Sequence, residues 1–87
     1  MGEDAYPNLA SKAAALMEPL IRNHPFLDGN KRTAVLAVIL FHNINGLDLI
    51  ADQEAVVRLA VDVAEGSAGI DAIARLLASW ARPLGRT

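Results

Sequence analysis

Residues 24–33, with the sequence His-Pro-Phe-Leu-Asp-Gly-Asn-Lys-Arg-Thr, gather the side chains that a phosphoryl transfer would need. His24 carries an imidazole, whose charge changes near neutral pH, and it could accept the proton of an attacking hydroxyl. Asp28 offers a carboxylate that could hold Mg²⁺ beside phosphate oxygens. Lys31 and Arg32 could clamp those phosphates. A base, a metal carboxylate and a cationic clamp together suit phosphoryl or nucleotidyl transfer.

The same segment predicts a junction between two helices. Pro25 disfavours helical geometry at His24, so one helix should end there. Gly29 can take a positive φ in the loop that follows. A second helix should begin near Asn30, and the free N–H groups of its first turn would form an anion site. Lys31 and Arg32, in this first turn, would each cost the helix about 0.3–1 kcal/mol, which a bound phosphate would offset.

Each residue of the segment also has a purely structural interpretation. His24 could be only the last residue of a helix, and Asp28 with Gly29 could be only a turn. Lys31 beside Arg32 is compatible with a solvated pair of charges, and Phe26 is expected to anchor the loop in the core. We favour a functional site because all of these residue types occur together in one short junction.

Hydrophobic spacing predicts that four helices position this junction. They are expected over about residues 8–23, 30–43, 51–65 and 70–81, with the third ending at Gly66. The second is apolar on nearly every side, so we expect it at the centre of the bundle. The prediction is an all-α, compact helical bundle in a single domain, 1–87, with residues 82–87 as a loose tail and no strand strongly indicated. His42 and Trp80 are expected in the core.

Length and composition exclude several classes of protein. The chain has 87 residues, 53% of them hydrophobic, and it has no Cys. This excludes disorder, a disulfide scaffold and a thiolate metal site. The net charge of −2 argues against direct nucleic acid binding. The longest apolar run, residues 34–41, is far shorter than a membrane span, and no targeting signal is visible, so we expect no membrane association and a cytoplasmic location.

The segment resembles the signature of the Fic/Doc family, whose pattern is His-Pro-Phe-x-Asp/Glu-Gly-Asn-Gly/Lys-Arg. The match covers His24, Pro25, Phe26, Asp28, Gly29, Asn30, Lys31 and Arg32. A looser resemblance extends from Tyr6 and Pro7 to the region of Trp80. The resemblance implies that His24 is the base and Asp28 the Mg²⁺ ligand. It also implies that Gly29 and Asn30 shape the anion hole, and that Lys31 and Arg32 hold phosphates.

Two positions favour the Doc toxin branch. Fic adenylyltransferases usually carry Gly at the position of Lys31 and a second Arg at the position of Val35. Proteins of the Doc branch transfer the γ-phosphate of ATP to a protein hydroxyl, with elongation factor Tu as the class of target, and thereby block translation. The resemblance therefore implies ATP and Mg²⁺ as cofactors, a protein substrate and a cognate antitoxin as partners.

Two alternatives remain open from the sequence. The first is a Fic-type adenylyltransferase, which shares the motif up to Asn30. The second is a non-catalytic interaction module, because members of the Doc branch usually carry an N-terminal segment, including a flap beside the site, ahead of the point where this chain starts. Loss of that segment would expose apolar surface, which could pair in a homodimer or bind a helix of a partner.

Overall fold

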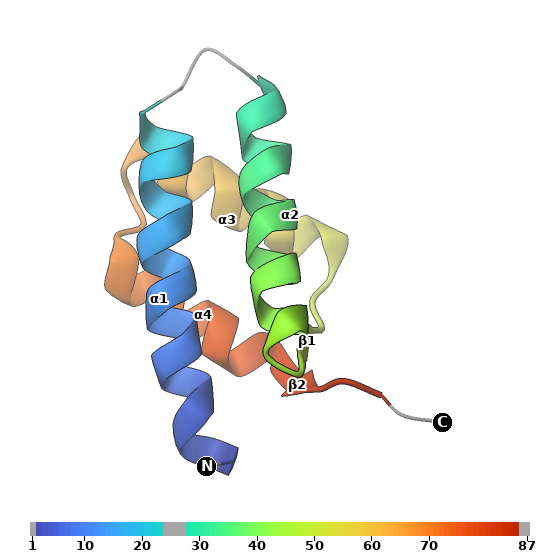
Figure 1. Ribbon diagram of the computed structural model, residues 1–87. Coiled ribbons are helices and arrows are strands. Elements are labelled where there is room, and N and C mark those ends of the chain that lie inside the picture. Colours follow the sequence, from blue (N-terminus) through green and yellow to red (C-terminus); the bar gives the residue numbers. More distant parts are fainter. Residues whose placement is uncertain (1, 24–27, 86–87) are drawn as a thin grey trace.

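Four helices and two short strands make up the part of the chain that the structure describes (Figure 1). This computed structural model describes the backbone of residues 2–23 and 28–85, and the side chains of residues 8–23 and 31–85. In chain order the elements are α1 (Gly2–Arg22), α2 (Asp28–Ile44), β1 (Leu47–Leu49), α3 (Gln53–Glu65), α4 (Ile70–Trp80) and β2 (Ala81–Pro83). The prediction of a compact all-α bundle is confirmed, with a small two-stranded sheet added to it.

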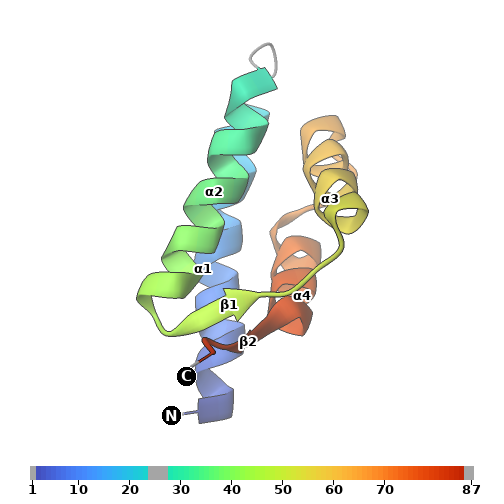
Figure 2. The same cartoon turned by 90° about the vertical axis from the view of Figure 1, so that its right-hand side faces the viewer.

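The bundle has two layers, with α1 and α2 in one and α3 and α4 in the other (Figure 2). Helix α1 packs against all three other helices. Its buried face is rich in alanine, including Ala10, Ala13 and Ala14, so neighbouring backbones can approach closely. The larger buried side chains fill the space between the layers: Met17, Ile21, Val38, Leu59, Val63, Ile73 and Leu77. The radius of gyration, 12.3 Å, is close to the value of about 12 Å expected for a globular chain of this length.

Helix α2 is not buried on every side, so the prediction that it lies at the centre is wrong. Its inner face is closed by Ala34 and Val38, but Leu36 and Leu40 are 59% and 58% exposed. The central place belongs to α1, whose small residues face three helices at once. A bundle of two layers buries only one side of each outer helix, and the apolar composition of α2 does not by itself supply a partner for the other side.

A two-stranded antiparallel sheet, which the sequence did not indicate, joins the segments that follow α2 and α4. Leu47 pairs with Pro83, and Leu49 pairs with Ala81. The backbone N–H of Leu84 also donates to the carbonyl oxygen of Gly46 at 3.0 Å. Residues 82–84 are therefore held by the ladder, and the predicted loose tail is wrong for them. Strands of three residues are too short to show an alternating pattern, so only the meeting of two distant segments creates them.

Several helix boundaries agree with the sequence and others shift. Gly66 caps α3 in the left-handed conformation with φ 83°, as predicted, while Asp52 occupies the N-cap position without a side-chain hydrogen bond. Helix α1 begins six residues before the predicted Asn8 and runs through Pro19. Leu16 of α1 and Leu76 of α4 are each 41% exposed. Among the described residues, none of the helices combines the length and apolar character that crossing a membrane would require.

Candidate functional site at the start of helix α2

The first turn of α2 contains the acidic and small residues of the motif. Asp28, Gly29 and Asn30 are the first three residues of this helix, not members of a preceding loop. The helix thus begins two residues earlier than predicted, and Gly29 does not need the left-handed conformation expected of it. The first four N–H groups of an α-helix have no partner within it. The backbone N–H groups of residues 28–30 are therefore the donors that the predicted anion site would use.

The remaining residues of the motif fall partly outside the described structure. His24, Pro25, Phe26 and Leu27 lie outside the described residues, so the position of the predicted base is not given. The ends that flank them are given: Asn23 donates its N–H to the carbonyl of Pro19 at 2.9 Å, and α2 begins at Asp28. Both helix ends lie at the same end of the bundle (Figure 1).

Arg22 fixes the end of α1 immediately before the motif. Its guanidinium forms an ion pair with Glu18 at 3.2 Å, one turn earlier in α1. It also lies against the turn that ends α3, because a Cβ added to Gly66 would be 3.7 Å from its Cζ atom. The carbonyls of Asp62 and Val63 point out of α3 at this turn and accept backbone N–H groups there. A cation at a helix C-terminus is electrostatically favourable, so the Arg22 guanidinium stabilises the contact between the C-terminal ends of α1 and α3.

Lys31 and Arg32 lie at one end of a groove between α2 and α3. The groove has a volume of about 500 Å³, and its walls are mainly apolar, with Val35 and Leu36 on α2 facing Val57 and others on α3. Lys31 is half-buried and takes part in a further polar interaction, whereas Arg32 is exposed. Lys31 is the fourth residue of the helix and Arg32 the fifth, so the dipole penalty applies less to Arg32 than the sequence suggested.

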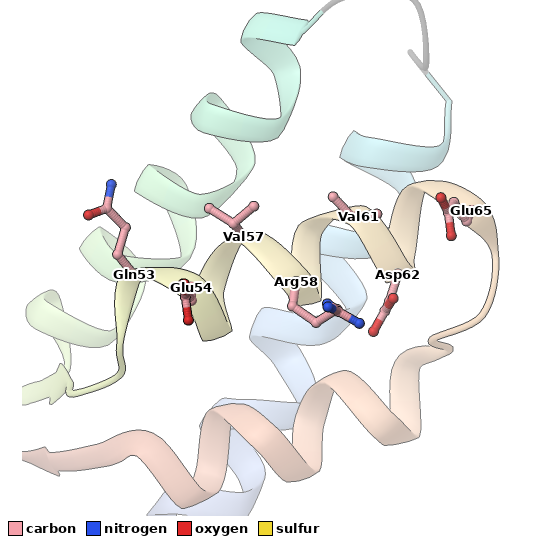
Figure 3. A pocket seen from close by; sticks show the side chains of 7 residues that line it. All are labelled: Gln53, Glu54, Val57, Arg58, Val61, Asp62 and Glu65. Carbon is pink, nitrogen blue, oxygen red and sulfur yellow. The ribbon is translucent and has the colours of Figure 1, made fainter.

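The α3 wall of the groove contains residues that the sequence analysis did not single out. Gln53, Val57 and Val61 lie along one side of α3, as Figure 3 shows, and all three line the groove. Val57 and Val61 are spaced by four residues and are exposed, unlike Leu59, Ala60 and Val63 of the same helix. The spacing of four residues was the signal in the sequence that could have identified Val57 and Val61. It indicates a second apolar face on α3 that a binding surface could use.

A wider hollow of about 800 Å³ lies along α3 (Figure 3). The side chains that line it do not combine into a catalytic or binding site. All of the side chains that line it come from this one helix, and they mix acidic, basic and aliphatic types: Gln53, Glu54, Val57, Arg58, Val61, Asp62 and Glu65. Arg58 is exposed. We therefore place the candidate site at the start of α2 and not here.

A Mg²⁺ ion shared with phosphate, as the sequence predicts, would be held at the start of α2 by Asp28. Within the described residues no three His, Cys, Asp or Glu side chains come together as a metal cage. Asp28 stands beside the free N–H groups of a helix N-terminus and close in sequence to two cations. Mg²⁺ is commonly held by one or two carboxylates together with substrate phosphates and water. That mode needs no cage, and one carboxylate at this place suits it.

Val35 offers no charge to the candidate site. Its side chain is half-buried and forms part of the groove wall and of a small apolar cavity of about 40 Å³ behind it. Met17, Leu59 and Trp80 line the same cavity, so Val35 connects the groove to the core. An arginine side chain at this position would have to turn away from the core to reach a phosphate.

His42 is a core residue, which confirms its predicted role. The side chain is fully buried, and its Nδ1 lies 2.9 Å from the carbonyl oxygen of Val38. Its ring meets that of Phe41 edge-on, with the centroids 6.0 Å apart. Nothing among the described residues joins it in a metal site. Trp80, also predicted in the core, is partly buried and packs against it.

Comparisons with known proteins agree with the motif. Residues 1–42 match the Fic/DOC family. A protein named Toxin Doc from Mycolicibacterium smegmatis is 48% identical over 82 residues, which cover 92% of this chain. The chain spans 63% of the length of that relative. No solved structure matches the chain. Together with the complete signature at residues 24–32 and the helical fold around it, these matches support the Fic/DOC family, and its Doc toxin branch, as the family of this chain.

Proposed function

We propose that this chain is a Doc-type toxin that transfers the γ-phosphate of ATP to a hydroxyl group of a protein. The observation that carries the proposal is the position of Lys31 and Arg32, which stand beside the N-terminus of α2 in a groove large enough for a ligand. Lys31 and Arg32 border this groove and follow directly in sequence on the N-terminal N–H groups of α2, and a polyphosphate needs such a combination of cations and N–H donors. The similarity to a protein named Toxin Doc supports the same conclusion.

In the proposed reaction His24 acts as the general base. Its imidazole accepts the proton of the substrate hydroxyl while that oxygen forms a bond to the γ-phosphorus. The bond between the γ-phosphorus and the bridging oxygen breaks, and ADP leaves with the electron pair. Lys31, Arg32 and the N–H groups of the first turn of α2 stabilise the negative charge of the phosphates during the transfer. Asp28 would hold Mg²⁺, which when bound neutralises part of the charge on the phosphate oxygens.

Transfer of a phosphoryl group is favoured over transfer of AMP by the environment of Val35. In the adenylyltransferases that the motif resembles, an arginine at this position grips the nucleotide phosphates. Here an aliphatic side chain fills the place and packs toward the core. Without that second arginine, the clamp consists of Lys31 and Arg32, which stand next to each other near the helix N-terminus.

For the partners we propose a protein substrate of the elongation factor Tu class and a cognate antitoxin. Modification of that target would arrest translation, and the antitoxin would restrain the activity. A small reading frame directly upstream that encodes such a partner would support this biological role. If co-expression with that partner did not relieve growth arrest, the assignment as a toxin of this kind would be wrong.

The decisive assay compares two labelled forms of ATP. We expect Mg²⁺-dependent transfer of label from γ-labelled ATP, and none from α-labelled ATP, to elongation factor Tu. Transfer of the α label alone would support adenylyl transfer and exclude the proposed reaction. His24→Ala is expected to lower the rate by about 10²–10⁴-fold.

Matched variants test whether the cations of the groove act on phosphate. Arg32→Ala should weaken ATP binding, measured by calorimetry in the presence of Mg²⁺, by about tenfold or more, because one charge-assisted hydrogen bond is worth about 1.5–3 kcal/mol. Arg75→Ala removes another exposed arginine, from α4, and should leave binding unchanged. Asp28→Ala should abolish the Mg²⁺ dependence. Absence of any heat with the unmodified chain would favour a non-catalytic interaction module.

A further inference from the structure

One side chain in the last turn of α1, that of Arg22, reaches the turn that ends α3 (Figure 1). A Cβ added to Gly66 would lie 3.7 Å from the Cζ atom of Arg22 and 3.8 Å from each of its two Nη atoms. Because these three distances are nearly equal, the flat face of the guanidinium, and not its edge, lies against the backbone of Gly66. The end of α1 is therefore in contact with the end of α3 through a planar group.

Pro19 makes this contact more important than it would be in an uninterrupted helix. Proline has no backbone N–H, so the carbonyl of Ala15 loses its usual donor one turn before the end of α1. The last turn is then joined to the rest of the helix by fewer backbone hydrogen bonds, and its side chains carry more of its attachment. Ile21, which is 1% exposed, anchors this turn in the core, and Arg22 anchors it to α3.

The ion pair between Arg22 and Glu18 cannot replace the contact with Gly66. Glu18 lies one turn earlier in α1 itself, so the pair orients the guanidinium but does not connect α1 to α3. Both side chains are partly exposed, and exposed ion pairs contribute little to stability. The attachment to α3 therefore depends on the planar shape of the guanidinium, which the ammonium group of a lysine does not have.

We propose that Arg22 is a positioning residue for the phosphoryl transfer. Arg22 precedes His24, the proposed base, by two residues, so the turn that it ties to α3 sets the point from which the chain enters the motif. The inference rests on the proposed function, in which the base must meet the substrate hydroxyl at hydrogen-bonding distance. Displacement of a reacting group by about 1 Å can lower a rate by about 10²-fold. The proposed phosphate contacts come from Lys31 and Arg32, so Arg22 should affect the rate and not the binding of ATP.

The substitution Arg22→Lys tests this role, because lysine keeps the charge but has no planar group to lie against Gly66. We expect the rate of γ-phosphate transfer at saturating ATP to fall by about 10–100-fold, while the affinity for ATP, measured by calorimetry with Mg²⁺, stays within about twofold. Arg58→Lys makes the same change at an exposed arginine of α3 and should leave both quantities unchanged. An unchanged rate in Arg22→Lys would overturn the proposal. An equal loss of ATP affinity would also overturn it, because Arg22 would then bind the nucleotide itself.

NMR of the imidazole groups gives a second readout that does not require activity. The chain has two histidines, so the His42→Leu variant identifies the signals of His24. Arg22→Lys should shift the His24 signals and speed hydrogen exchange at the N–H of Asn23, which donates to the carbonyl of Pro19. Arg58→Lys should change neither.

The two readouts separate failure of this proposal from failure of the proposed function. If the unmodified chain transferred no γ-phosphate, the proposed function would be wrong, and the NMR signals would still decide whether Arg22 positions His24. Unchanged His24 signals in Arg22→Lys would overturn the positioning role whether or not the chain is active. Urea unfolding of both lysine variants checks that they stay folded under the conditions of the assays.

Discussion

His42 gives a prediction whose magnitude can be worked out from single contacts. The side chain is fully buried in α2, and its Nδ1 lies 2.9 Å from the carbonyl oxygen of Val38. A carbonyl oxygen can only accept, so the ring proton sits on Nδ1 and the lone pair of Nε2 needs a donor. That atom is buried and has no hydrogen-bond partner. One satisfied and one unsatisfied polar atom thus share the ring.

The substitution His42→Leu should make the protein more stable. Removing an unsatisfied buried atom recovers about 1–3 kcal/mol, while losing the bond to Val38 costs about 0.5–1.5 kcal/mol. The Val38 carbonyl keeps its helical bond from the backbone at position 42, so the substitution leaves no new unpaired group. We expect a net increase of about 1 kcal/mol in the free energy of unfolding, or about 4–8 °C in Tm for a domain of this size.

Urea unfolding followed by tryptophan fluorescence measures this change. Trp80 is the single tryptophan of the chain and packs against the core, so its emission reports loss of the fold. The midpoint should rise while the slope stays constant. Ile73→Val, at a fully buried position, calibrates the assay with an expected loss of about 0.5–1.5 kcal/mol. If the His42→Leu variant were less stable than the unmodified chain by 1 kcal/mol or more, the unsatisfied state of Nε2 would be refuted.

The same variant separates the two histidines of the chain by function. Phosphotransfer should survive His42→Leu, because that side chain is enclosed in the core. It should fall steeply in His24→Ala. Equal losses of activity in both variants would contradict the assignment of His24 as the base.

Two further pairs of variants test the fold by comparing neighbours or equivalents. Gly66→Ala and Gly46→Ala each force alanine into a left-handed conformation, with φ 83° and 82°, and each should lower the free energy of unfolding by about 1–2 kcal/mol. Their effects should be similar, because an added Cβ meets nothing within 4 Å at Gly46 and makes only an ordinary van der Waals contact with Arg22 at Gly66. A much larger loss of stability at Gly66 would show that this contact is tighter than in the structure. Leu77→Ala, at a position 2% exposed, should cost about 2–5 kcal/mol in urea unfolding, whereas Leu76→Ala, 41% exposed, should cost far less. Equal losses from the two leucines would contradict the orientation of α4.

Much of the helical architecture could be predicted from local patterns. The spacing of apolar residues located all four helices, and Gly66 ended α3 where predicted because few other residues adopt the left-handed conformation readily. The boundaries of α1 and α2 were less accurate, since each begins earlier than its predicted first residue. Helix starts depend on weak capping preferences that neighbouring structure can override.

The small sheet and the exposed face of α2 could not be predicted from local patterns. Leu47 pairs with Pro83 across a long stretch of chain, and no short window of sequence contains both. The side chains at positions 36 and 40 of α2 are as apolar as the buried one at position 38. Which of them meets a neighbour depends on where α1 and α3 lie, and that is a property of the assembled bundle.

Sequence alone was enough to predict a chemistry for the candidate site, because a base, a carboxylate and two cations within one short segment are recognisable without any fold. It also determined the helical class, through the periodicity of apolar residues. Only the tertiary structure brought Val57 and Val61 of α3 opposite Lys31 and Arg32 to form a groove. It also left the outer face of α2 without a neighbour. The physical reason is that residue type and spacing act within a few turns of chain, whereas a groove or an uncovered face exists only between elements that packing has placed side by side.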